Sequence, residues 1–258
     1  MWRGGEAAAA KKRLVDSVGA DLPVVELRPD WRTEKTVLGA LASGDEPYFD
    51  ALAAALSSSD VVVCRLGLGA ETLGEVVTEA DVAWPLMRPG ELAASQHDAQ
   101  GATVLVAGSS PSGYERGDRY LQYGELLPGG EWPALTRAHE ALGAFADAFA
   151  PRLPSLKICA TSDTFVARFP GDGLGYGAHY DGNDGVCVLT AILYTSPAWS
   201  PGDGGMFHAL DPYERAWLAT PPEADTLLIF RADRILHKVL PCFGPRVALT
   251  IFFSKAAP

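Results

Sequence analysis

The sequence FPGDGLGYGAHYDGNDG occupies residues 169–185. Its glycines, proline and acidic residues are typical of turns, and they flank a short run that contains His179 and Asp181. On extended backbone, residues i and i+2 point to the same face, so both side chains could reach one metal ion. The segment therefore predicts short strands between turns, with a candidate pair of metal ligands.

A second histidine, His237, follows Asp181 by 56 residues. Two histidines and one carboxylate make up the facial triad of non-haem Fe(II) oxygenases, which leaves one face of an octahedral ion open for O2 and a bidentate cosubstrate. The His-x-Asp pair alone is weak evidence, because any chain with five histidines can contain one by chance. The alternative is a pair of hydrogen-bonded surface histidines.

Arg246 lies nine residues beyond His237 and strengthens the metal hypothesis. Residues 241–245 (PCFGP) between them are typical of a turn, so we expect His237 and Arg246 on adjacent antiparallel strands. A guanidinium there could grip a carboxylate through two hydrogen bonds, about one cosubstrate length from the metal. Thr250 and Phe252 share the face of Arg246 by period-two counting, which adds a hydroxyl and an apolar wall. The alternative for Arg246 is a surface salt bridge.

The order of the predicted elements indicates an α+β fold. Residues 1–44 show little periodicity and are expected to form a weakly structured extension. Helices are then expected after Asp45, at 71–81 and at 133–150. Short strands separated by Gly, Pro and Asp turns follow, as in a sandwich or closed barrel. The strands expected in this second half are 164–169, 186–194, 205–210, 226–230, 235–240 and 246–253.

Composition excludes several classes of protein. The 258 residues have a hydrophobic content of 48% and a mean hydropathy of +0.06, and no apolar run approaches the roughly 20 residues of a membrane span. A net charge of −11 without a basic stripe argues against nucleic-acid binding. The four cysteines include no CxxC pair, which favours reduced thiols in a cytosol-like compartment. We expect a cytoplasmic or nuclear protein, with a monomer favoured.

From about Arg168 to Phe253 the sequence resembles the prolyl hydroxylase domain enzymes that act on hypoxia-inducible factor, and their microbial relatives. The matching segments are FPGDGLGYGAHYDGNDG, LTAILYTSPAW, DGGMFHAL, DTLLIFRADRILHKV and RVALTIFF. The resemblance implies a double-stranded β-helix, a jelly-roll-like barrel, supported by N-terminal helices. Residues 45–258 would then form a single Fe(II)/2-oxoglutarate dioxygenase domain, with helical support at 45–150 and the catalytic core at 160–254.

The resemblance also implies roles for the candidate site residues. Carried over by position, it makes His179, Asp181 and His237 the iron ligands. Arg246 becomes the anchor of the 2-oxoglutarate carboxylate, and Tyr194 would give that carboxylate a hydrogen bond from its phenol. The alternative for Tyr194 is an ordinary core aromatic of its strand.

Other positions of the resemblance concern the pocket walls and the substrate. Tyr176 would line the pocket near the metal. Arg116 and Asp118, in the sequence RGD, fall where the family has a mobile loop over the substrate, although a solvated loop tip is the simpler interpretation. Phe169 stands where the animal enzymes have a tyrosine, and Phe252 where they have a tryptophan. Both changes keep an aromatic wall beside the cosubstrate, and the first removes a hydroxyl.

The activity that the resemblance implies is hydroxylation of a prolyl residue at C4 in a protein substrate. The enzyme would use Fe(II), 2-oxoglutarate and O2, with ascorbate as reductant, and would produce succinate and CO2; oxygen sensing is an associated role. One alternative is a related oxygenase that acts on another residue or on a small molecule. The other is a catalytically silent binding module of the same fold.

Overall fold

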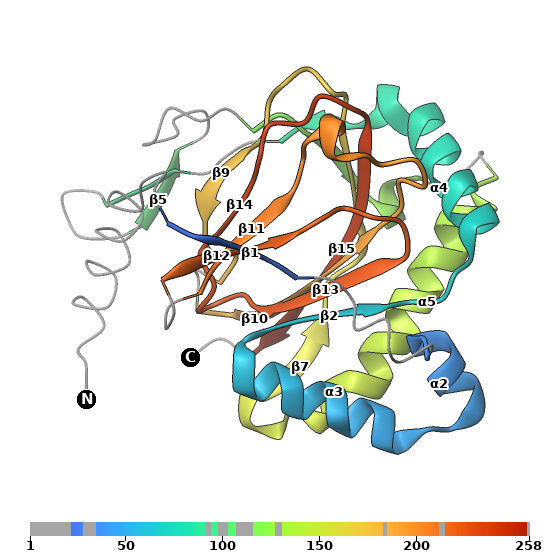
Figure 1. The fold of residues 1–258 in the computed structure, drawn as a ribbon, viewed down its shortest axis with the longest axis vertical. Helices are drawn as coiled ribbons and strands as arrows, with labels where there is room; N and C mark the ends of the chain where they lie inside the picture. Colours follow the sequence, from blue (N-terminus) through green and yellow to red (C-terminus); the bar gives the residue numbers. More distant parts are fainter. Residues whose placement is uncertain are drawn as a thin grey trace.

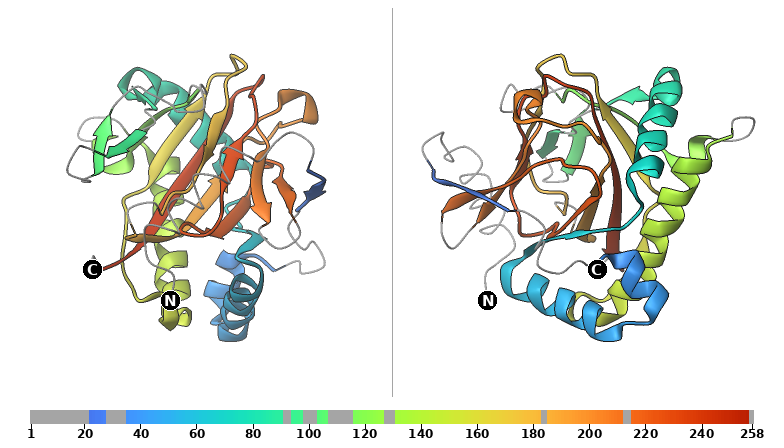
Figure 2. Two further views of the ribbon diagram at one scale, coloured as in Figure 1. Left: turned by 90° about the vertical axis from the view of Figure 1, so that its left-hand side faces the viewer. Right: turned by 45° about the vertical axis from the view of Figure 1, so that its right-hand side comes forward.

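The computed structural model describes residues 22–27, 35–90, 94–97, 103–106, 116–126, 131–182, 185–211 and 215–256. In these residues two β-sheets face each other, and α-helices lie outside one of them (Figures 1 and 2). This arrangement is the double-stranded β-helix of an α+β protein, as the sequence predicted. None of the described helices is long and apolar enough to cross a bilayer.

The larger sheet is built around two long central strands, β10 and β15, which pair antiparallel along most of their length. Its strand order is β2-β13-β10-β15-β8-β6-β3, and β7 also pairs with β15. The bounds are β2 Val61–Arg65, β3 Arg88–Pro89, β6 Arg119–Gln122, β7 Ile158–Thr161, β8 Phe165–Phe169, β10 Cys187–Tyr194, β13 Thr226–Arg231 and β15 Arg246–Lys255.

The smaller sheet faces the larger one and has the order β1-β12-β11-β14-β9. Strand β1 pairs parallel with β12, and the other neighbours are antiparallel. The bounds are β1 Val24–Glu26, β9 Tyr176–His179, β11 Phe207–Asp211, β12 Ala216–Thr220 and β14 His237–Val239. Strands β4 (Ala94–His97) and β5 (Thr103–Val106) form a separate hairpin.

The main hydrophobic core lies between the helices and the larger sheet. Helix α5 contributes the longest apolar stripe, with residues such as Leu135, Leu142 and Phe149 at helical spacing. The α-helices are α2 Val37–Ser43, α3 Glu46–Ser59, α4 Ala70–Ala83 and α5 Pro133–Phe149. Short 3-10 turns are η1 Trp84–Leu86, η2 Tyr123–Leu126, η3 Ala150–Arg152, η4 Pro154–Leu156 and η5 Pro201–Asp203.

Strand β15 separates this core from the interior of the barrel. Because side chains alternate along a strand, Val247, Leu249, Ile251 and Phe253 pack into the core against the helices. The intervening residues, Arg246, Ala248, Thr250 and Phe252, line a pocket between the two sheets. The helices therefore hold in place the strand whose other face builds the pocket.

Helix α2 lies within the stretch that was expected to be weakly structured. Thr36 caps its start, since its hydroxyl accepts a hydrogen bond from the Gly39 amide (3.1 Å), and Gly44 ends it at a φ of 62°. A helix of seven residues is too short to show a clear helical period in the sequence. Residues 1–21 and 28–34 of the same stretch lie outside the described residues.

The prediction that His237 and Arg246 lie on adjacent antiparallel strands is wrong. His237 is on β14, which pairs with β9 and β11 in the smaller sheet, whereas Arg246 is on β15 in the larger sheet. Residues 241–245 do not reverse the chain within one sheet but carry it from one sheet to the other. Hydrogen bonds from the Phe243 and Gly244 amides to the Asp203 carbonyl hold this crossing. The two side chains therefore line the same pocket from opposite sheets.

The start of helix α5 depends on a side chain from α4. Its N-cap residue, Trp132, has no side-chain capping bond. Instead, Glu79 accepts hydrogen bonds from the amides of Ala134 (2.9 Å) and Leu135 (2.8 Å) through its two carboxylate oxygens. A carboxylate at this end also interacts favourably with the helix dipole. Glu79 thus joins two of the helices that cover the larger sheet.

We predict that Glu79→Ala lowers the free energy of unfolding by about 1–2 kcal/mol, because two amides of the first turn lose their acceptor. Urea denaturation of both proteins measures the difference. Glu75→Ala on the same helix is the control: it removes an exposed ion pair with Arg137, which is worth about 1 kcal/mol at most. Equal losses in the two variants would contradict the capping role.

Candidate metal centre and pocket

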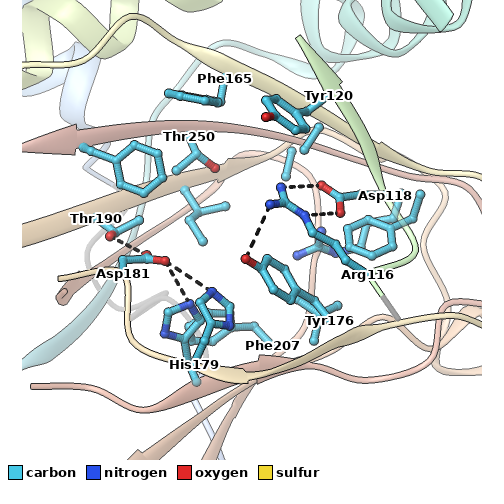
Figure 3. Close-up of a pocket in the computed structure, with 18 residues that line it drawn as sticks. Arg116, Asp118, Tyr120, Phe165, Tyr176, His179, Asp181, Thr190, Phe207 and Thr250 are labelled. Carbon is cyan, nitrogen blue, oxygen red and sulfur yellow. Dashed lines mark hydrogen bonds and ion pairs between the residues drawn. The ribbon is translucent and has the colours of Figure 1, made fainter. Parts of the chain in front are cut away.

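Three potential metal ligands meet where β9 and β14 pair. His179 and His237 are cross-strand partners in this ladder, and Asp181 follows the end of β9 by two residues. Oδ1 of Asp181 lies 3.2 Å from Nε2 of His179 and 3.6 Å from Nε2 of His237. The three ligand atoms all lie within 4.8 Å of one another. Figure 3 shows the Asp181 carboxylate turned toward the His179 imidazole. The structure thus brings the three predicted residues together.

Backbone carbonyls fix the tautomer of both histidines. Nδ1 of His179 lies 2.8 Å from the Gly177 carbonyl oxygen, and Nδ1 of His237 lies 3.2 Å from that of Ile235. A carbonyl oxygen can only accept, so each Nδ1 carries a hydrogen and donates it. In the neutral ring, Nε2 then presents a lone pair. Burial, together with the nearby His179 ring, lowers the pKa of His237 to about 4, so His237 is neutral at neutral pH.

Aromatic side chains hold the two imidazole rings in place. Tyr176 stacks on His179, with 3.9 Å between ring centroids and an interplanar angle of 15°. The His237 ring contacts Phe207 at 5.1 Å and Phe230 at 4.7 Å between centroids. These contacts restrict rotation about the side-chain bonds, so the Nε2 atoms keep their direction.

Asp181 completes a group of three acceptors. Burial alone would raise the pKa of its carboxyl group, but the positive charge of the imidazoles when they are protonated, together with the hydrogen bond from Thr190, holds the pKa below its usual range. The carboxyl group is therefore ionised at neutral pH, and with both imidazoles neutral its Oδ1 faces two nitrogen lone pairs. No hydrogen lies between these three atoms when His179 and His237 are neutral. A cation bound among them would satisfy all three, so the donor set fits a metal ion.

Arg246 faces this group from the larger sheet. It is 4% exposed, and its guanidinium lies over the rings of Phe169 (5.1 Å) and Tyr194 (4.9 Å). Its Nε and the hydroxyl of the fully buried Tyr194 have no well-formed hydrogen bond among the described residues. Burial raises the pKa of Tyr194 to about 12 although the Arg246 charge opposes this, so its hydroxyl is protonated. A buried cation without an anionic partner among the described residues fits a pocket that receives an anion.

The predicted wall residues occupy the same pocket. Phe169 is the cross-strand partner of Arg246, and its side chain is buried. Thr250 and Phe252 line the pocket from the strand of Arg246, as the period-two count predicted. Phe252 meets Phe165 edge to face at 5.3 Å between centroids. These residues therefore place three aromatic rings beside the Arg246 guanidinium and the Thr250 hydroxyl.

Arg116 and Asp118 lie on the pocket wall, paired with each other. The Arg116 guanidinium donates to both carboxylate oxygens of Asp118, at 2.5 and 2.9 Å, and lies 4.5 Å from the centre of the Tyr176 ring (Figure 3). Asp118 is buried, and the Gly117 amide donates to the Gly175 carbonyl. The pair is therefore built into the wall rather than being a solvated loop tip.

Sequence reasoning missed several residues of the pocket. Thr190 and Ile192 alternate with Tyr194 on β10, so counting back in steps of two from Tyr194 could have found them. Phe207 and Val239 also line the pocket, from the smaller sheet. They carry no distinctive chemistry: Val239 follows His237 by two residues on the same strand, and only the pairing of β11 with β14 brings Phe207 to this site.

The arrangement has the chemistry of an octahedral metal site with a neighbouring anion pocket. Two imidazole nitrogens and one carboxylate oxygen suit an iron-class ion and leave positions open for other ligands. The Arg246 guanidinium, across the same pocket, suits the far carboxylate of a ligand that also reaches the metal.

Comparisons with known proteins agree with this geometry. Residues 164–254 match the family model of the 2OG-Fe(II) oxygenase superfamily. The human protein Egl nine homolog 1 is 36% identical over 109 residues, which are 41% of this chain and 25% of that protein. Human prolyl hydroxylase EGLN3 is 33% identical over 109 residues, 41% of this chain and 45% of that protein. The chain thus spans less than half the length of the curated relatives it matches.

Among solved structures, a prolyl hydroxylase from Trichoplax adhaerens, in complex with a peptide fragment of the hypoxia-inducible factor oxygen degradation domain, has a TM-score of 0.65. It is 24% identical, and the match covers 87% of this chain and 95% of that one. A Pseudomonas putida prolyl-4-hydroxylase has a TM-score of 0.62 at 20% identity, and the match covers 81% of this chain and 100% of that one. These two likenesses show the fold. In sequence, the chain is similar to the 2OG-Fe(II) oxygenase superfamily over residues 164–254 and, within it, to the human prolyl hydroxylase EGLN3 and to Egl nine homolog 1.

Proposed function

We propose that this protein is an Fe(II)- and 2-oxoglutarate-dependent dioxygenase that hydroxylates a prolyl residue, at C4, in a protein substrate. One observation carries the proposal. The acceptor atoms of His179, Asp181 and His237 converge in a pocket whose opposite wall holds the buried Arg246, which has no anionic partner among the described residues. A metal and a dicarboxylate cosubstrate would satisfy both features at once.

The three ligands would hold the iron from one side. Nε2 of His179, Nε2 of His237 and Oδ1 of Asp181 would supply three bonds, and the remaining positions would face the pocket. When bound, the iron supplies the oxidative chemistry, in which O2 is reduced, 2-oxoglutarate becomes succinate and CO2, and one oxygen atom enters a C–H bond of the substrate. The Gly177 and Ile235 carbonyls and the stacked aromatic rings would keep the imidazoles oriented.

Arg246 would bind the far carboxylate of 2-oxoglutarate through two charge-assisted hydrogen bonds. The Tyr194 hydroxyl, which is protonated, would donate a further hydrogen bond to it. Thr250 would add a hydroxyl from the same strand face, while Phe169 and Phe252 would exclude water. Because Phe169 carries no hydroxyl, its ring can contribute only apolar and cation–π contact with Arg246.

The substrate would enter past Arg116, Asp118 and Tyr176, which line the pocket on the side of His179. The prolyl assignment rests on the relatives, which include human prolyl hydroxylase EGLN3 and the Trichoplax enzyme bound to a peptide. Arg116 is already paired with Asp118. We therefore propose that it contributes mainly its stacked face and its remaining hydrogens to the substrate.

Finer properties belong to the same proposal. Ascorbate would serve as reductant, and a reaction that consumes O2 could act in oxygen sensing. None of the four cysteines, all of which lie among the described residues, is in a disulfide bond, which is compatible with a cytoplasmic or nuclear monomer. A related oxygenase for another residue or a small molecule, or a silent binding module, are the competing functions. The intact ligand set and Arg246 favour an active enzyme over a silent one.

The first prediction concerns the metal. The wild-type protein should bind one Fe(II) or Mn(II) per chain under nitrogen, measured by isothermal titration and by metal analysis after desalting. His237→Ala should lose this binding, because one of three ligands is gone. His208→Ala is the matched control: His208 is also buried, but it lies on the neighbouring strand beside Trp217 and Lys238, away from the pocket. Metal binding by His237→Ala at wild-type affinity would contradict the assignment.

The second prediction concerns Arg246→Met, which keeps an apolar side chain of similar length. Loss of a charge-assisted bidentate contact should weaken 2-oxoglutarate binding by about ten- to a hundredfold, with metal binding unchanged. The free energy of unfolding without cosubstrate should not fall, because the variant removes a buried charge that has no ionic partner in the part of the chain that the structure describes. Titration of the Mn(II)-loaded protein and chemical denaturation test the two parts. Unchanged 2-oxoglutarate affinity would place the anchor elsewhere.

The proposed reaction itself is tested by incubating proline-containing peptides and host proteins with the enzyme, Fe(II), ascorbate and 2-oxoglutarate. Peptide mapping should find one added oxygen atom on proline, matched by succinate, and neither should appear with His237→Ala. Succinate with oxidation of another residue or of a small molecule would favour the first alternative. Metal and 2-oxoglutarate binding without any succinate would favour the silent module.

A further inference from the structure

The two oxygens of the Asp181 carboxylate have different surroundings. Oδ1 faces Nε2 of both histidines, at 3.2 and 3.6 Å. Oδ2 points away from them and accepts a hydrogen bond of 2.7 Å from the Thr190 hydroxyl. Figure 3 shows Thr190 on the far side of the carboxylate from His179. The carboxylate is thus held with one oxygen toward the metal centre and the other turned from it.

Thr190 reaches Asp181 from the opposite sheet. It lies in the middle of β10, between its cross-strand partners Phe230 on β13 and Phe252 on β15, and it is fully buried. Asp181, by contrast, follows β9 of the smaller sheet. The hydrogen bond therefore ties the turn that carries a candidate metal ligand to a strand of the larger sheet that is paired on both sides.

From this geometry we propose that Thr190 is a positioning residue that makes Asp181 a one-oxygen ligand of the metal. The inference rests on the proposed function, because it assumes that His179, Asp181 and His237 hold the ion. The Thr190 hydroxyl engages Oδ2 and so keeps this oxygen from swinging round to bind the metal together with Oδ1.

The number of Asp181 oxygens that bind the metal matters because few coordination positions stay open on the ion. Carboxylates bind metal ions through one oxygen or through both. With one oxygen from Asp181, three positions of an octahedral ion stay open, which is enough for a bidentate cosubstrate and O2. With both oxygens bound, two positions would stay open, and a bidentate cosubstrate would fill them. Thr190 would thus preserve the position that O2 needs.

The test uses Co(II), whose visible absorption reports its coordination, in place of iron. Thr190→Val removes the hydroxyl at nearly constant volume, and Thr190→Ser keeps it. The matched control is Thr226→Val: Thr226 is a buried strand residue whose hydroxyl has no hydrogen-bond partner among the described residues. Each protein is titrated with Co(II) and then with 2-oxoglutarate, and circular dichroism checks that each is folded. Thr190→Ala replaces Thr190→Val if the latter does not fold.

We expect the Co(II) spectrum of Thr190→Val to differ from that of the wild type before 2-oxoglutarate is added. Its affinity for Co(II) should be weaker by about tenfold or more, because a hydrogen-bonded neighbour of a metal ligand is lost, whereas 2-oxoglutarate should still bind in the two positions that stay open. Thr190→Ser should restore both properties, and Thr226→Val should change neither. A wild-type spectrum and affinity in Thr190→Val would overturn the inference alone, as would failure of Thr190→Ser to restore them. Absence of Co(II) binding by the wild type would instead overturn the proposed function.

Discussion

The convergence of three hydrogen-bond acceptors on one point is the constraint on which the rest of this structure depends. Two imidazole nitrogens and a carboxylate oxygen lie within 4.8 Å of one another, and with both rings neutral their lone pairs repel one another unless a cation lies among them. The protein maintains this arrangement with backbone carbonyls behind each Nδ1 and with the Thr190 hydroxyl behind Asp181. Each of these contacts also fixes the direction in which a ligand atom points.

The two sheets contribute different groups to the pocket, and each strand can do so because its side chains alternate between the two faces of its sheet. One face of the larger sheet packs on α2, α3, α4 and α5, and its other face presents Arg246, Thr190 and Tyr194 to the interior. The smaller sheet contributes His179 and His237 as partners in one ladder. The two sheets close over each other, and this places the metal site on one side of the pocket and the Arg246 guanidinium on the other. The helices stabilise the site without contributing any of these groups.

Much of the site could be predicted from local pattern. The i, i+2 spacing of His179 and Asp181 and the period-two face of β15 are properties of extended backbone, so they hold in the structure. The path between His237 and Arg246 was mispredicted because a turn sequence does not show whether the chain returns to the same sheet or crosses to the other. Strand β12 (Ala216–Thr220) was missed because two of its five residues, AWLAT, are alanines, which are depleted in strands, and the segment is too short to show a clear alternation. Counting in steps of two from Tyr194 could have placed Thr190 on the pocket face, but its hydrogen bond to Asp181 could not be predicted because it joins two different sheets.

A crystal structure obtained under nitrogen with Fe(II) and 2-oxoglutarate, using anomalous scattering at the iron absorption edge, tests the central claim most directly. The account predicts a single strong iron peak bonded to Nε2 of His179, Nε2 of His237 and Oδ1 of Asp181. It also predicts that the far carboxylate of 2-oxoglutarate lies against the Arg246 guanidinium and the Tyr194 hydroxyl. An iron peak outside these three ligands, or a cosubstrate whose far carboxylate does not meet Arg246, would contradict it.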